Sequence, residues 1–186
     1  MKRMLLTLIM FATVLSLPCS LSARNNKIDN TPVPAIDIPR YMGLWYEIAR
    51  FDHRFERDMS GTIAVYSQKN NGTIRVENSG WKDNKYKRSV GKAKAVRNTA
   101  NEPTLLRVSF FGPFYSDYRV LMLDENYRYA LVGSGSSKYL WILSRTPDLP
   151  YHTRMNIIRE AQRRGYDTSH LVWVDQNDNI RMYSRF

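Results

Sequence analysis

The sequence has almost no cysteine and little histidine. Its 186 residues include one cysteine, Cys19, and three histidines, His53, His152 and His170. A lone cysteine forms no disulfide within its own chain, and these histidines lack the close spacing of a metal-binding motif such as His-Glu-x-x-His. We therefore expect a folded domain without disulfides, thiol chemistry or a metal site.

Sequence motifs of common enzymes are also absent. Residues 133–137 read Gly-Ser-Gly-Ser-Ser, which lacks the Gly-x-Ser-x-Gly spacing of a nucleophile elbow. The sequence contains no glycine-rich phosphate-binding loop. We interpret residues 133–137 as a flexible hairpin loop, and we expect a protein that is not an enzyme and needs no cofactor.

The N-terminal hydrophobic run is too short to cross a membrane. This run, Met4–Leu17, follows Lys2 and Arg3, whereas a membrane-spanning helix needs roughly 20 apolar residues. A short positive segment, an apolar run and then small residues are typical of an export signal. We predict a signal peptide over residues 1–22 and an exported protein, and a single membrane anchor is the alternative.

Cys19 stands where a bacterial lipoprotein carries its acylated cysteine. The residue before it, Pro18, differs from the small residue that a lipoprotein signal has at that position. Two interpretations therefore stay open, which are acylation of Cys19 as a lipoprotein anchor and removal of Cys19 with the signal peptide. Both place the protein in the periplasm or at the outer membrane.

The composition changes after the signal peptide. Residues 23–40 contain asparagines and three prolines without hydrophobic periodicity, which predicts a linker. We predict one domain over residues 41–176, followed by a C-terminal tail over residues 177–186, because a chain of 186 residues can form one sizeable core. The twelve tyrosines, seven phenylalanines and four tryptophans of the whole chain favour strands.

Short segments with alternating polar and apolar residues follow one another along the domain. Asn70, Asn71 and Gly72 join two of these segments and form a strong hairpin signal. The eight predicted strands are Leu44–Phe51, Thr62–Gln68, Thr73–Asn78, Ser89–Val96, Leu105–Phe110, Tyr118–Leu123, Tyr129–Val132 and Lys138–Leu143. They predict an all-β fold, an eight-stranded up-and-down antiparallel barrel whose interior can hold one small ligand.

One helix interrupts the series of strands. Thr153–Arg164, within a helix over about residues 152–164, has apolar residues at helical spacing, and Gly165 follows as a C-cap. We predict that this C-terminal α-helix packs outside the barrel and that a short strand, Leu171–Val174, follows it.

Four segments follow one another in order along the predicted domain. The first, Gly43–Arg57, contains a Gly-x-Trp signature, and the others are Val108–Tyr115, Leu123–Val132 and Leu140–Pro147. Together they resemble the bacterial lipocalins, the outer-membrane and periplasmic members of the superfamily that are similar to apolipoprotein D. The resemblance covers residues 41–174 and implies a ligand cavity inside the barrel. One departure is Leu123, which stands before Asp124 where many superfamily members have threonine.

The residues that match the lipocalin motifs have structural roles in this interpretation. Gly43 permits close backbone packing, and Trp45 fills the narrow end of the barrel. We expect Arg145 to lie over Trp45 in a cation–π contact worth about 0.5–2 kcal/mol. Asp124 is in register with the middle motif. Glu47 falls near the closed end, and we expect it to form an ion pair with Arg145.

Strand parity, anchored on an inward-pointing Trp45, predicts the residues that contact a ligand. Small side chains on the early strands leave space, and aromatic and aliphatic side chains opposite them form an apolar wall. The predicted ligand-binding residues are Ala49, Phe51, Ala64, Tyr66, Val76, Asn78, Ser89, Ala93, Val108, Phe110, Tyr118, Val120, Met122, Tyr139 and Trp141. The alternative is that these side chains simply fill the barrel.

Charge and aromatic residues suggest the partners. The formal net charge is +11, with basic residues gathered over residues 82–94 and on the helix, which favours anionic membrane surfaces. We expect no nucleic-acid partner, because no nucleic-acid motif is present and the protein is exported. The loop Phe110–Tyr115 is interpreted as a lip, a membrane contact, a homodimer contact or part of the core.

The leading hypothesis for function is lipid binding in the bacterial cell envelope. In this hypothesis the barrel binds fatty acids, lysophospholipids or similar amphiphiles for transport, storage or membrane maintenance. The alternatives are a lipocalin-fold enzyme that acts on a lipid or isoprenoid, and a protein whose basic surface binds anionic membranes.

Overall fold

A computed structural model of the protein describes residues 28–96 and 105–179. The predicted signal peptide and Cys19 lie outside these residues, as does most of the predicted C-terminal tail.

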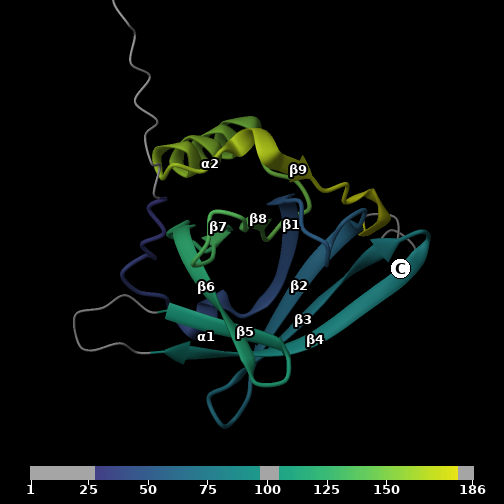
Figure 1. The fold of residues 1–186 in the computed structure, drawn as a ribbon, viewed down its shortest axis with the longest axis vertical. Helices are drawn as coiled ribbons and strands as arrows, with labels where there is room; N and C mark the ends of the chain where they lie inside the picture. The colour runs from purple at the N-terminus through teal and green to yellow at the C-terminus, as the bar shows by residue number, and fades with distance from the viewer. Residues whose placement is uncertain (1–27, 97–104, 180–186) are drawn as a thin grey trace, which may run out of the picture.

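Eight antiparallel strands form a closed barrel (Figure 1). They are β1 (Gly43–Phe51), β2 (Ser60–Gln68), β3 (Ile74–Lys82), β4 (Lys85–Val96), β5 (Leu105–Phe111), β6 (Phe114–Leu123), β7 (Tyr129–Gly133) and β8 (Leu140–Ser144). Each strand pairs with the next along the chain, and β1 pairs with both β2 and β8, which closes the barrel. The predicted up-and-down barrel is confirmed.

The remaining elements lie at one end and on one side of the barrel. Helix α1 (Ile38–Tyr41) begins in the segment predicted as a linker and ends at the first residue of the predicted domain. Helix α2 (Tyr151–Arg163) packs outside the barrel, which confirms the predicted helix (Figure 1). A short 3-10 helix, η1 (Thr168–His170), leads into β9 (Leu171–Trp173), which pairs with the end of β1.

The hairpin turns of β3–β4 and β5–β6 are tighter than the sequence predicted. Strands β3 and β4 meet at Asp83 and Asn84, whose φ angles are 52° and 56°. Such angles suit a two-residue turn, which asparagine and aspartate tolerate without glycine. β5 and β6 likewise pair up to Phe111 and Phe114. The predicted strands Thr73–Asn78, Ser89–Val96 and Tyr118–Leu123 were therefore too short.

Two β-bulges direct apolar side chains towards α2. In β1 the pairing with β8 shifts between Glu47 and Ala49, so that Ile48 is an extra residue. In β6 the pairing with β7 shifts in the same way at Leu121. Ile48, Ala49 and Leu121 belong to an outer hydrophobic cluster with the buried α2 residue Ile157. The bulges thus supply the apolar surface that holds the helix on the barrel.

Trp45 and Arg145 occupy the closed end of the barrel, next to α1. The Trp45 ring is fully buried, and the Arg145 guanidinium carbon lies 3.8 Å from its centroid. Arg145 donates hydrogen bonds to the backbone oxygens of Leu44 (2.6 Å) and Tyr41 (3.2 Å). Gly43 has a φ of +94°, and a Cβ at that position would lie 3.5 Å from Arg145 Nη1. That distance is an ordinary van der Waals contact, so it is the positive φ that favours glycine here.

Asp124 organises the turn between β6 and β7. Its two carboxylate oxygens accept hydrogen bonds from Arg128, each over 2.8 Å, and one also accepts from the backbone N–H of Asn126. The hydrogen bonds from the Arg128 side chain are the largest cause that lowers the pKa of Asp124 to about 2. The carboxylate is therefore ionised across the neutral range and holds the turn closed.

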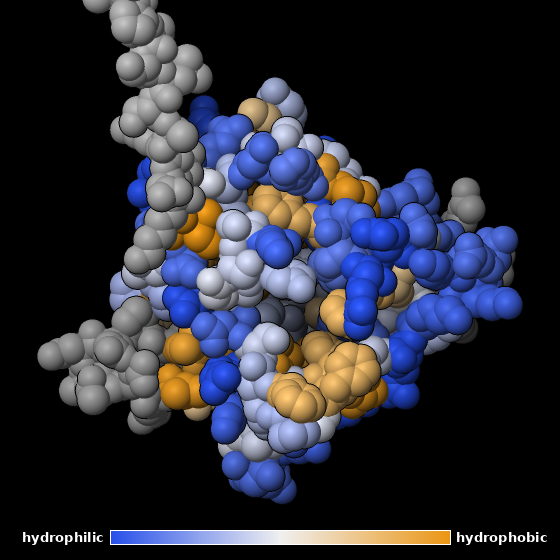
Figure 2. Space-filling view, viewed as in Figure 1, coloured by the Kyte–Doolittle hydropathy of each residue, from blue (hydrophilic) through white to orange (hydrophobic). Residues whose placement is uncertain are grey.

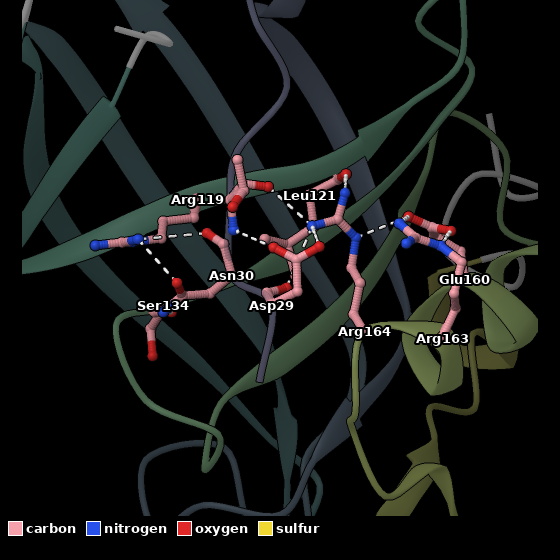
Figure 3. Close-up of polar contacts among 9 residues, drawn as sticks. Asp29, Asn30, Arg119, Leu121, Ser134, Glu160, Arg163 and Arg164 are labelled. Atoms are coloured by element: carbon pink, nitrogen blue, oxygen red, sulfur yellow. Dashed lines mark hydrogen bonds and ion pairs between the residues drawn. The ribbon is translucent and has the colours of Figure 1, made fainter. Parts of the chain in front are cut away.

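The segment before α1 is tied to the barrel and to α2 (Figure 3). The Arg164 guanidinium donates to the backbone oxygens of Thr31 (2.9 Å) and Leu121 (2.7 Å), and it pairs with Glu160 (2.7 Å). Further along the segment, the backbone N–H of Val33 donates to Val120 O over 2.8 Å. Arg164 thus joins three parts of the chain that are distant in sequence.

No helix in the described residues is long and apolar enough to span a bilayer.

Arg164 and Arg163 give a matched test of this connection, because both pair with Glu160. The Arg164 side chain is 10% exposed, whereas that of Arg163 is 62% exposed and makes only a surface ion pair. We expect Arg164→Ala to lower the free energy of unfolding by about 2 kcal/mol, because the part-buried backbone oxygen of Leu121 and that of Thr31 lose a charged donor. Arg163→Ala should lower it by less than about 0.5 kcal/mol. Urea denaturation measures both, and equal losses would contradict the role of Arg164.

Candidate ligand cavity

A cavity of about 100 Å³ lies inside the barrel. This volume is below the roughly 300–1,000 Å³ of sites for drug-sized ligands, so a slender chain suits it better than a ring system. The residues that line it are Glu47, Glu56, Ala64, Tyr66, Val76, Asn78, Val108, Phe110, Tyr118, Val132, Trp141 and Leu143. Most of this wall is aliphatic or aromatic, with the charged side chains on β1 and the β1–β2 loop.

Most of the residues predicted to contact a ligand meet at this cavity. Those that line it are Ala64, Tyr66, Val76, Asn78, Val108, Phe110, Tyr118 and Trp141. Ala93 and Val120 are buried in the hydrophobic cluster inside the barrel without lining the cavity. Ser89 is exposed, and Tyr139 stacks on Trp141 with ring centroids 5.9 Å apart. These last two lie outside the cavity wall.

The predicted side-chain directions of three residues are wrong. Ala49, Phe51 and Met122 lie in or against the outer cluster beneath α2 and not at the cavity. The cause is the pair of bulges, because one extra residue in a strand moves every later side chain to the opposite face. Strand parity counted from Trp45 is correct up to Glu47 and fails beyond Ile48.

Four cavity residues were absent from the predicted set. Val132 lies opposite Trp141 in the β7–β8 pairing, and Leu143 is two residues beyond Trp141, so alternation from Trp141 could have identified both. Glu56 lies in the β1–β2 loop, where no periodicity applies. Glu47 was assigned to an ion pair with Arg145, and that prediction is wrong.

Glu47 pairs with a buried arginine of its own strand. Its Oε1 accepts a hydrogen bond from Arg50 Nη1 over 2.7 Å, and the Arg50 side chain is only 2% exposed. Arg50 Nη2 donates to the backbone oxygens of Glu56 and Met59 in the β1–β2 loop. The bulge at Ile48 brings Arg50 to the same side of β1 as Glu47, which allows this pair to form.

Glu56 belongs to a cluster of polar side chains at the wall of the cavity. Its carboxylate lies 2.9 Å from His53 Nε2 and accepts a hydrogen bond from Trp141 Nε1 over 3.2 Å. Burial acts to raise the pKa of Glu56, but the His53 and Trp141 contacts outweigh it and lower that pKa. Burial and the neighbouring Glu56 raise the pKa of Glu47 well above its ordinary value. Glu47 is therefore the member of the pair that more readily holds a proton.

Three tyrosine hydroxyls meet inside the barrel, and two of these tyrosines, Tyr66 and Tyr118, line the cavity. The Tyr118 hydroxyl lies 2.7 Å from that of Tyr41 and 3.0 Å from that of Tyr66. Burial raises the pKa of all three phenols, so they stay protonated and bond to one another. This group satisfies its own hydroxyls and contacts the aromatic ring of Trp45 through Tyr41.

The cavity suits binding of a chain with a polar end. Its aliphatic wall accepts methylene groups, and its carboxylates and amide accept hydrogen bonds. Among the residues that the structure describes, no three histidine, cysteine, aspartate or glutamate side chains are placed to hold a metal ion.

Arg50 and Arg57 test how far the buried carboxylates depend on their guanidinium. At neutral pH, Arg50→Met should lower the free energy of unfolding by about 3 kcal/mol, because it leaves buried carboxylates without their cation. This deficit should shrink towards pH 4, because protonation removes the uncompensated charge. Arg57→Met removes an exposed arginine paired with Asp52 and should cost less than about 0.5 kcal/mol. Urea denaturation at both pH values measures the effect, and a pH-independent deficit would contradict it.

Comparisons with known proteins agree with this architecture. The model of the Lipocalin-like domain family matches residues 36–176. The outer membrane lipoprotein Blc of Escherichia coli strain K12 is 41% identical over 172 residues, which cover 92% of this chain and 97% of that protein. The protein of the same name from Vibrio cholerae El Tor is 43% identical over 148 residues, which cover 78% of this chain and 85% of its own.

A solved structure shows the same fold at lower identity. Insecticyanin from the tobacco hornworm Manduca sexta superposes with a TM-score of 0.64 at 22% identity, over 79% of this chain and 84% of that chain. The family model and the identity with the Blc proteins extend over the same residues as the closed barrel, its Gly-x-Trp strand and its outer helix. The chain belongs to the lipocalin family.

Proposed function

We propose that this lipocalin binds single-chain lipids, such as fatty acids and lysophospholipids, inside its barrel and carries, stores or supplies them in the bacterial cell envelope. The observation that carries the proposal is the narrow cavity, which is walled mainly by aliphatic and aromatic side chains and also contains polar groups. An alkyl chain gains about 0.8 kcal/mol for each methylene that it buries. A chain lying along Val76, Val132 and Leu143 therefore suits this site.

Two features support a place in the envelope. Relatives with 41–43% identity have names that place them in the outer membrane as lipoproteins. The N-terminal sequence, with its apolar run and Cys19, reads as an export signal. Acylation of Cys19 and removal of Cys19 with the signal peptide both remain compatible with this location.

Binding without catalysis fits the cavity better than an enzyme acting on a lipid or isoprenoid. Its carboxylates are engaged by Arg50, His53 and Trp141, and its tyrosine hydroxyls bond to one another. Turnover of a lipid substrate by the purified protein, lost when the cavity is filled, would support the enzyme instead.

Filling the cavity tests the proposed function. Ala64 lines the cavity and is 8% exposed, so Ala64→Trp should block it and abolish lipid binding, at a cost in stability of about 1–3 kcal/mol. Val90 is 45% exposed, and Val90→Trp adds the same ring outside the cavity wall as a control. Native mass spectrometry of protein extracted mildly from its own cells should detect a bound lipid in wild type and Val90→Trp only. An empty wild type that also takes up no lysophospholipid in titration would refute the proposal.

We also propose that exposed aromatic side chains bring the barrel to an anionic membrane. Phe111 and Phe114, at the β5–β6 turn, are 67% and 80% exposed, and Phe55 packs against Phe111 with ring centroids 6.2 Å apart. Figure 2 shows apolar side chains near this turn with hydrophilic residues around them. The formal net charge of +11 favours anionic lipids. A homodimer that covers the same aromatic side chains is the alternative.

Sedimentation with vesicles measures this contact. The double variant Phe111→Ser, Phe114→Ser should reduce co-sedimentation with vesicles rich in phosphatidylglycerol by about tenfold, because two rings no longer enter the interface. Tyr151→Ser removes a ring that is 74% exposed on α2 and should change nothing. If the double variant instead alters only the protein's mass in solution, the aromatic side chains form a dimer contact and the membrane proposal fails.

A further inference from the structure

The charged side chains that line the cavity are both acidic. Glu47 comes from β1 and Glu56 from the β1–β2 loop, and the two residues are only 5% and 9% exposed. If the barrel binds single-chain lipids, as proposed above, then these carboxylates are the charges that a bound head group meets. Their sign bears on which head group the cavity accepts.

The buried cation beside the two acidic side chains does not face the cavity. Arg50 pairs with Glu47 but is absent from the cavity wall, and its second terminal nitrogen is turned to the backbone of the β1–β2 loop. The Glu56 carboxylate has a histidine and a tryptophan N–H as its direct contacts. The wall therefore faces the cavity with acidic oxygen atoms, while the guanidinium lies behind them.

A neutral side chain on another strand independently favours a ligand whose head group donates hydrogen bonds. Asn78, on β3, lines the cavity, and its Oδ1 is buried and accepts no hydrogen bond in the structure. A buried acceptor without a donor destabilises the folded protein, so a ligand that supplies a donor binds more tightly there. Tyr66 and Tyr118, the other polar side chains of the wall, have each other as partners.

The chemistry of common head groups separates them at such a wall. An ammonium carries three donors and a positive charge, and its hydrogen bonds to carboxylates are charge-assisted. A fatty-acid carboxylate has only acceptors when ionised, and beside the buried carboxylate of Glu56 it meets like charge at low dielectric. An alcohol offers one donor and no charge, so it falls between the two.

We propose that the acidic wall formed by Glu47 and Glu56 makes this cavity selective for single-chain amphiphiles with an ammonium head group over fatty acids of the same chain length.

Three ligands with the same ten-carbon chain separate the head group from the chain. Isothermal titration of the folded protein with decylammonium, decanol and decanoate at neutral pH, below micelle formation, should give affinities in that order, with about a tenfold difference between decylammonium and decanoate. The formal net charge of +11 attracts decanoate and repels decylammonium, so the expected order runs against long-range electrostatics. The order of the three affinities should therefore persist when salt screens the surface charges.

Two glutamate variants show whether the acidic wall causes the order of the ligand affinities. Glu56→Gln removes one acidic group of the cavity and should reduce the preference for decylammonium over decanoate to less than about threefold. Glu125→Gln removes an equal charge from the exposed β6–β7 turn and should leave the preference unchanged. Because the order of the three ligands is measured on the wild type, the test does not depend on the folding of a variant.

The outcomes separate this inference from the proposed function. If decanoate binds wild type as tightly as decylammonium or more tightly, the selectivity is refuted while lipid binding stands. If none of the three ligands binds, the proposed function fails and the inference fails with it. If Glu125→Gln lowers the preference as much as Glu56→Gln does, the cause is overall charge, and the role of the wall is refuted.

Discussion

One extra residue in the first strand determines which side chains point into the barrel and which pack beneath the outer helix. Without Ile48, simple alternation would point Ala49 and Phe51 into the barrel and leave Arg50 outside. With it, Ala49 and Phe51 pack beneath α2, and Arg50 reaches the interior beside Glu47. The bulge thus places apolar side chains beneath the helix and places the Arg50 guanidinium next to Glu47.

The opposite end of the barrel depends on a different kind of contact. There, Arg145 covers Trp45 and donates to backbone oxygens of the chain entering β1, so a charged side chain closes the barrel through hydrogen bonds and a cation–π contact. Its guanidinium is engaged at this end and takes no part in the cavity wall. Arg145 and Arg50 therefore have separate roles, since Arg145 closes the barrel and the buried Arg50 pairs with the acidic wall.

The architecture could be predicted from the sequence because it rests on local patterns. Alternation in segments such as Leu105–Phe110, the Asn71-Gly72 turn and the C-cap at Gly165 each indicate one element, and eight strands in series leave few topologies. The bulges at Ile48 and Leu121 leave no such pattern, since an extra residue in a strand changes direction without changing composition. The position of Glu56 depends on a loop conformation, and the pairing of Glu47 with Arg50 depends on the bulge.

Contacts between a bound lipid chain and individual methyl groups test the account most directly. In the methyl-labelled protein saturated with a single-chain lysophospholipid, nuclear Overhauser effects should connect the alkyl chain to Val76, Val132 and Leu143 in the cavity. The chain should show none to Leu131 and Ile157, which are fully buried in the outer cluster. Effects to Leu131 and Ile157 without any to the cavity methyls would contradict binding inside the barrel.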